Sequence, residues 1–195
     1  MNNFPEAISF VLENEGRYSN NPSDKGGETY MGITRKYYPM WEGWKIIDEI
    51  KKNYSPPSRW FKQDMEQYTL KQAAVDFYKK NYWDPLKLDN IKIPRVRTKI
   101  LDMSVNLGVS RTASIVQICV NLMTSNELVV DNIIGSSTIN LINSVCQDDN
   151  GEFLLKLLTL QQGYIYMKLC QLDSSQEKFI RGWINRLHMS IGEFK

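Results

Sequence analysis

The sequence contains very little histidine and cysteine. Its 195 residues include one histidine, His188, and three cysteines, Cys119, Cys146 and Cys170, which lie far apart in apolar helical surroundings. An odd number of widely separated cysteines excludes a disulfide framework and a CxxC metal site. A single histidine also argues against a histidine-based metal site or a catalytic triad. The sequence therefore predicts no metal and no cofactor.

An excess of charge of one sign and a long apolar run are missing as well. The 24 basic residues nearly balance the 22 acidic ones, and the net charge of +2 gives no reason to expect nucleic acid as a partner. The most apolar stretch, residues 153–172, is interrupted by Lys156 and Lys168, so we expect no membrane span. Residues 1–6 lack the basic and apolar regions of a signal peptide. We expect a protein that is made in the cytoplasm without a classical signal peptide.

Helical periodicity is what the sequence does contain. Apolar residues at helical spacing predict about eight helices with short connections, which pack into a single, mostly-α globule. Gly, Asn, Ser and Pro gather between residues 17 and 29, and residues 30–34 predict one strand of a small β-hairpin near residues 18–34. A helix is expected to start after Thr34. Thr69 is expected to cap the N-terminus of another helix, and Gly108 to end a third.

The first predicted helix ends at a glutamate. Phe4, Ile8, Val11 and Glu15 fall on one stripe of this helix, and Gly16 supplies the stop. A carboxylate at the end of an apolar face is partly desolvated and meets the negative end of the helix dipole, and both effects raise its pKa. General acid catalysis near neutral pH needs such a carboxylic acid. Glu15 is therefore a candidate general acid, although a solvated glutamate in the last turn would fit the same pattern.

An ordered set of motifs extends over nearly the whole chain. The segments are Glu15-Gly16-Arg17-Tyr18, Asn21-Pro22-x-Asp24-x-Gly26-Gly27-x-Thr29-x-x-Gly32-Ile33-Thr34, Tyr82-Trp83, Leu101-Asp102-Met103-Ser104-Val105-Asn106-Leu107-Gly108 and Arg181-Gly182-Trp183-Ile184-Asn185-Arg186. In this order they resemble glycoside hydrolase family 108, bacterial and phage muramidases with a lysozyme-like fold, some of which are called secretion activator proteins. Residues 130–138 resemble the peptidoglycan-binding segment in the second half of such proteins.

The resemblance implies a lysozyme-like, multi-helix globule. It implies a muramidase half over residues 1–90 and a helical, peptidoglycan-binding-type half over residues 91–195, packed together as one unit. Glu15 would protonate the leaving oxygen when the β-1,4 bond from N-acetylmuramic acid to N-acetylglucosamine breaks. The partner would be the glycan strands of peptidoglycan. An export or holin system would then bring the enzyme to the cell wall, in the periplasm or outside the cell.

A second catalytic carboxylate is suggested by spacing. Asp24 follows Glu15 by nine residues, which resembles phage-type lysozymes, where a threonine six positions after the aspartate also lines the cleft. Here Tyr30 occupies that position and Thr29 lies beside it. Asp24 could stabilise charge in the reaction or only stabilise its own turn. Glu28, in the same loop, is predicted to be a solvated surface charge.

Further residues are candidates for binding the substrate. Tyr18 and Tyr30 could stack on sugar rings, although aromatic residues in such positions often close a core. Asn106 lies on an otherwise apolar helix and could bond to the catalytic loop or to an acetamido group. Asp102, on the same helix, is expected to anchor the structure, and Trp83 is expected to pack in the core.

Two other functions are compatible with the same motifs. A lytic transglycosylase would need only the glutamate, because a hydroxyl group of the substrate replaces water. A non-catalytic peptidoglycan-binding or secretion-assisting protein would need no active site, and the intact Glu15 and its loop argue against this alternative.

Overall fold

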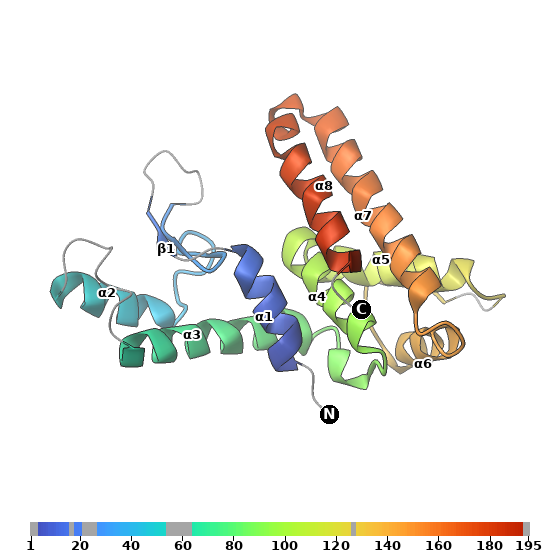
Figure 1. The fold of residues 1–195 in the computed structure, drawn as a ribbon, viewed down its shortest axis with the longest axis horizontal. Helices are drawn as coiled ribbons and strands as arrows, with labels where there is room; N and C mark the ends of the chain where they lie inside the picture. Colours follow the sequence, from blue (N-terminus) through green and yellow to red (C-terminus); the bar gives the residue numbers. More distant parts are fainter. Residues whose placement is uncertain (1–3, 16–17, 21–26, 54–63, 126–127, 193–195) are drawn as a thin grey trace. The chain divides into compact units, whose positions relative to one another are not determined.

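The computed structural model describes residues 4–15, 18–20, 27–53, 64–125 and 128–192 (Figure 1). Most of these residues are helical, and the chain divides into two compact units, with the boundary between residues 81 and 82. The prediction of a mostly-α fold with a small β element is confirmed.

The first unit is built on three helices and a small sheet. Helix α1 extends over Phe4–Glu15, α2 over Gly43–Asn53 and α3 over Asp64–Tyr78. The apolar residues of the stripe predicted for α1, Phe4, Ile8 and Val11, are buried, and Ala7 and Leu12 on the same helix are buried as well. Because Glu15 is the last residue of this helix, burial of the stripe fixes the main chain that carries it.

The sheet has three strands of two residues each. Strands β1 (Tyr18–Ser19), β2 (Thr29–Tyr30) and β3 (Ile33–Thr34) pair antiparallel in this order. The prediction of one strand over residues 30–34 was wrong, because Met31 and Gly32 form a turn between β2 and β3. Both have positive φ, 46° and 76°, as a two-residue hairpin turn requires.

The starts of α2 and α3 also differ from the prediction. No helix follows Thr34 directly, because α2 begins at Gly43, where the ring of Trp41 packs against the backbone and a Cβ would lie 2.3 Å from it. Helix α3 begins at Asp64, so Thr69 lies inside this helix and does not cap it. Residues 65–67 are Met, Glu and Gln, which favour helices and extend α3 toward its N-terminus.

All the regular elements in the described part of the second unit are helical. After the π-helical turn η2 (Lys79–Trp83) come the 3-10 turn η3 (Leu88–Asn90), α4 (Pro94–Leu107), α5 (Val109–Leu122), α6 (Ser136–Val145), α7 (Glu152–Leu172), the 3-10 turn η4 (Ser174–Gln176) and α8 (Glu177–Gly192). Helices α7 and α8 lie side by side (Figure 1). As predicted, Gly108 ends α4; its φ of 85° then turns the chain into α5. Trp83 is completely buried, in agreement with the packing role expected for it.

Candidate active site

Neither of the two candidate catalytic carboxylate groups belongs to the described side chains. The main chain of Glu15 ends α1, but its side chain lies outside the described residues, as does all of Asp24. Their roles therefore stay predictions. The described part of the site consists of β1, β2 and the side chains that fix these strands to α2.

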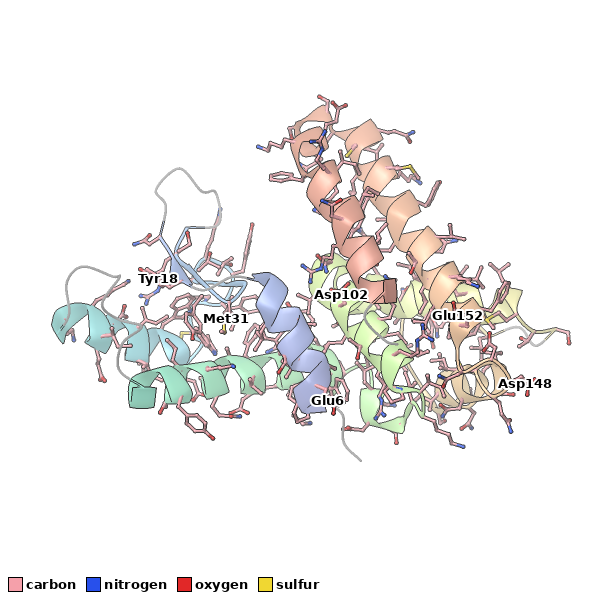
Figure 2. All side chains as sticks on the ribbon, in the orientation of Figure 1. Glu6, Tyr18, Met31, Asp102, Asp148 and Glu152 are labelled. Atoms are coloured by element: carbon pink, nitrogen blue, oxygen red, sulfur yellow. The ribbon has the colours of Figure 1, made fainter. Side chains whose placement is uncertain are left out.

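Glu28, the residue before β2, is the centre of this part. Its carboxylate accepts a hydrogen bond of 2.8 Å from the phenol of Tyr18 on β1, which Figure 2 labels. It forms ion pairs with Arg35, at 2.9 Å between Oε2 and Nε, and with Lys51 on α2. The side chain of Glu28 is only 10% exposed. The prediction of a solvated loop charge was wrong, because three donors from other segments surround this carboxylate.

Arg35 connects the Glu28 cluster to α2. Its guanidinium bonds both carboxylate oxygens of Asp48, at 2.7 and 3.1 Å, and lies 4.7 Å from the ring of Trp44. The bond to Asp48 raises the pKa of Arg35, and the same bond lowers the pKa of the Asp48 carboxyl. The cluster of Tyr18, Glu28, Arg35, Asp48 and Lys51, called the Glu28 cluster below, therefore holds the sheet on α2 through charged hydrogen bonds.

The sequence contained one signal for the position of Glu28. Side chains alternate between the two faces of a strand, so a strand that included residue 28 would place Glu28 on the same face as Tyr30. Tyr30 is an aromatic residue, and a buried ring at this position indicates that a side chain two residues earlier also points toward the interior. The partners Arg35 and Lys51 could not be chosen in this way, because they belong to other segments.

Three of the predicted binding residues lie on neighbouring strands. Tyr18 of β1 is opposite Tyr30 of β2, and Thr29 is next to Tyr30 in the chain. Tyr30 is 4% exposed, and its ring stacks on Trp41 with 6.0 Å between the centroids. Tyr18 and Thr29 are half-buried, and the Thr29 hydroxyl donates to the carbonyl of Gly27 at 3.3 Å. Burial and hydrogen bonding of the Tyr18 phenol to Glu28 raise its pKa, so the hydroxyl stays protonated at neutral pH.

Asn106 belongs to α4 in the second unit. Its side-chain amide is half-buried and donates to the carbonyl of Asp102, one turn earlier in the same helix, at 2.7 Å. This bond accounts for one of the hydrogen bonds that a partly buried amide needs.

Asp102, labelled in Figure 2, has the structural role that the sequence suggested. It is fully buried, and its Oδ1 accepts a hydrogen bond of 2.8 Å from Nε of Arg186 on α8. Next to it, the buried Lys99 donates to Gln162 at 2.7 Å, and Gln162 donates to the hydroxyl of Tyr166 at 2.8 Å. Two motif segments, 101–108 and 181–186, therefore meet in the interior of the second unit.

Among the residues that the structure describes, no three side chains of His, Cys, Asp or Glu come together as metal ligands. Within the same part of the chain, none of the helices combines the length and the apolar character needed to cross a membrane.

Comparison with known proteins gives two family matches in sequence, and similar folds among solved structures. The profile of the family described as Glycosyl hydrolase 108 matches residues 8–108, and that of the Predicted Peptidoglycan domain matches residues 112–188. The solved structure of Brucella abortus SagA is similar in fold, with a TM-score of 0.59 and 21% sequence identity over 96% of this chain and 91% of that one. No curated protein sequence matches the chain.

Proposed function

Because this chain belongs to the Glycosyl hydrolase 108 family, we propose that it is an N-acetylmuramidase that hydrolyses the β-1,4 bond between N-acetylmuramic acid and N-acetylglucosamine in peptidoglycan. The observation that carries the proposal is the family match over residues 8–108, which includes Glu15 and its loop. The peptidoglycan-type match over residues 112–188 supports peptidoglycan as the substrate and the cell wall as the place of action. The division into a muramidase half, residues 1–90, and a binding half, residues 91–195, is part of the proposal.

Glu15 is the proposed general acid. It continues the stripe of α1 on which Phe4, Ile8 and Val11 are buried, and the negative end of the helix dipole favours the protonated carboxyl. The protonated acid would donate its proton to the leaving glycosidic oxygen while positive charge develops on the sugar ring. Asp24 is the proposed second carboxylate, which would stabilise this charge or orient the attacking water.

The Glu28 cluster is proposed to support the substrate-binding wall. The hydrogen bond to Glu28 fixes the Tyr18 hydroxyl on this wall, where it would contact the substrate. Thr29 would add a second hydroxyl on the same two strands. Tyr30 would support Tyr18 and Thr29 from the buried side, because its ring stacks on Trp41. Asn106 is the proposed partner of an acetamido group.

Removal of the carboxylic acid tests the mechanism. We expect Glu15→Gln to reduce the release of soluble muropeptides from purified sacculi by at least about 100-fold, because general acid catalysis contributes roughly 10²–10⁴-fold. The matched control is Glu6→Gln, which changes an exposed glutamate in the first turn of the same helix. This control should keep its activity, and both variants should keep the circular dichroism of the parent protein.

The products distinguish the alternatives. A hydrolase leaves reducing N-acetylmuramic acid ends, whereas anhydro-muramic acid ends would identify a lytic transglycosylase and contradict the hydrolase proposal. Sacculus degradation that persists in Glu15→Gln would remove Glu15 from the mechanism. A parent protein that binds sacculi without degrading them would favour the non-catalytic, secretion-assisting alternative. How the protein reaches the wall, through a holin or an export system, stays a prediction.

A further inference from the structure

A groove in the first unit contains none of the residues assigned to catalysis. It lies between the segment 37–42, which precedes α2, and the C-terminal half of α3, and its volume is about 530 Å³. This volume is within the range of about 300–1,000 Å³ that is usual for small-ligand sites. All of its lining residues belong to one unit, so its shape depends only on contacts inside that unit. We call it the Tyr37 groove.

The floor of the Tyr37 groove is aromatic and rigid. The ring of Trp41 packs edge-on against Trp44, with 5.0 Å between the centroids, and against Phe77, at 6.3 Å. Its indole nitrogen donates to the carbonyl of Ala73 on α3 at 3.3 Å. Rings that are held by packing and a hydrogen bond lose little further freedom when a ligand binds, which favours affinity.

The rim of the groove carries aromatic surface that the fold does not cover. Tyr37 is 68% exposed, and Met40 beside it is more exposed still. The ammonium group of Lys36 lies 5.8 Å from the Tyr37 ring and leaves most of the ring accessible. An exposed, flat, amphipathic ring next to a concave aromatic floor is suited to contact the apolar face of a ligand and to hydrogen-bond with its edge.

The polar groups of the groove have mixed charge. Two carboxylates, Glu42 and Asp76, and one ammonium group, Lys80, line it, and Asp76 also accepts a bond from Gln72 at 2.9 Å. Two carboxylates disfavour a phosphate or another polyanion, and three charges disfavour an apolar helix. A neutral polyol fits this set, because its hydroxyl groups can donate to the carboxylates and accept from the ammonium group.

We propose that the Tyr37 groove binds a sugar ring of the glycan strand and holds the enzyme on the polymer, separately from the residues around Glu15. The inference rests on the proposed function, since this supplies the glycan as the ligand. A ring held in the groove raises the local concentration of the polymer at the enzyme, so the groove contributes to binding of long strands and not to the chemical step.

Binding to purified sacculi tests the groove without catalysis. In the Glu15→Gln background, we expect Tyr37→Ala and Asp76→Ala each to weaken binding on the order of tenfold, because each removes one contact of about 1–1.5 kcal/mol. The matched control is Tyr68→Ala on α3, whose side chain is 74% exposed and does not line the groove. Because these side chains are exposed, the variants should fold like the parent protein.

Two further measurements locate the effect. Titration with N-acetylglucosamine tetramer should shift the indole N–H resonance of Trp41, identified from a Trp41→Phe spectrum, and Tyr37→Ala should reduce this shift. In the active enzyme, Tyr37→Ala should raise the KM for sacculi on the order of tenfold while kcat falls by less than about twofold, because uniform binding is lost.

The outcomes separate this inference from the proposed function. The groove proposal would be overturned if Tyr37→Ala and Asp76→Ala bound sacculi as tightly as the parent protein does. It would also be overturned if Tyr68→Ala lost as much binding as these two variants. An inactive parent protein whose sacculus binding still depends on Tyr37 would overturn the muramidase and retain the groove. An active enzyme whose sacculus binding does not depend on Tyr37 would overturn the groove and retain the muramidase.

Discussion

Glu28 joins three segments of the first unit through one carboxylate. Tyr18 comes from β1, Arg35 from the segment after β3, and Lys51 from α2. Exposed ion pairs contribute little to stability, because water and salt screen them. At 10% exposure Glu28 is largely shielded from water, so its loss would remove one acceptor from two cations and one hydroxyl group.

We therefore expect Glu28→Gln to lower the free energy of unfolding by about 1–3 kcal/mol. Urea denaturation followed by tryptophan fluorescence would measure this change. The control is Glu49→Gln, an exposed position on α2, which should change stability by less than about 0.5 kcal/mol. Equal effects of the two substitutions would contradict the structural role of Glu28.

Single residues were predicted well where a repeating pattern decided their environment. The buried face of α1 follows from spacing alone, because every third or fourth side chain meets the same surface. The surroundings of Glu28 do not follow in this way, because its partners are brought to it by the turn at Met31 and by the docking of α2. The side chain of Glu15 and all of Asp24 lie outside the described residues, and their roles stay predictions.

At the scale of elements, α4 and α7 are joined by a buried polar chain. Lys99 of α4 donates to Gln162 of α7, which donates to Tyr166. Burial lowers the pKa of Lys99 to about 8, although the nearby Asp102 opposes this shift. Ring stacking of Tyr166 on Trp183, with 5.0 Å between the centroids, connects the same chain to α8.

This chain predicts a pH dependence of stability. An unfolded lysine has a pKa near 10.4, so from about pH 8 upward the unfolded state binds more protons than the folded state. The contribution of Lys99 to the free energy of unfolding is therefore present at high pH and is lost as pH falls through about 8. We expect the free energy of unfolding of the parent protein minus that of Lys99→Met to increase from pH 7 to pH 9. Guanidinium denaturation of both proteins at each pH would measure this.

The comparison with Lys99→Met is needed because other buried groups act in the opposite direction. Burial raises the pKa of Cys119 and of Tyr166 to about 12, and that of Cys146 to about 11. Their folded forms keep protons that the unfolded chain loses above about pH 8.5, so they lower stability as pH rises. The difference between the two proteins removes these contributions. A difference that stays constant with pH would contradict the assignment to Lys99.

The boundaries of the elements were harder to predict than their existence. The span of α7, Glu152–Leu172, coincides with the most apolar stretch of the sequence, residues 153–172. The start of α3 was not, because a threonine that could cap a helix lies in its interior. The start of α2 depends on the contact of Trp41 with Gly43, which periodicity does not contain.

At the scale of the whole molecule, one ion pair connects the first and last long helices of the second unit. Asp102 of α4 and Arg186 of α8 are 84 positions apart in the sequence, and the aspartate is fully buried. The sequence contained both motif segments, but it did not show that they meet. Similarity to a family identifies such residues, and only the folded chain shows which of them contact each other.

We expect Arg186→Met to lower the free energy of unfolding by about 3–5 kcal/mol, because it leaves a buried carboxylate without its partner. The double substitution Asp102→Leu with Arg186→Met should cost less than the sum of the two single substitutions, because it removes both charges. A double-mutant cycle, measured by chemical denaturation with tryptophan fluorescence, would test this coupling. Additive effects would show that the pair contributes no coupling.

The same pair affects how the protein is made. During translation Asp102 leaves the ribosome long before Arg186 is synthesised. Until then the Asp102 carboxylate lacks Arg186 as its partner and stays in water. The second unit can therefore complete its core only after residue 186 has left the exit tunnel, whereas the first unit ends at residue 81 and can fold earlier. While the second unit is incomplete, the apolar faces of its helices remain exposed, and exposed apolar surface favours aggregation.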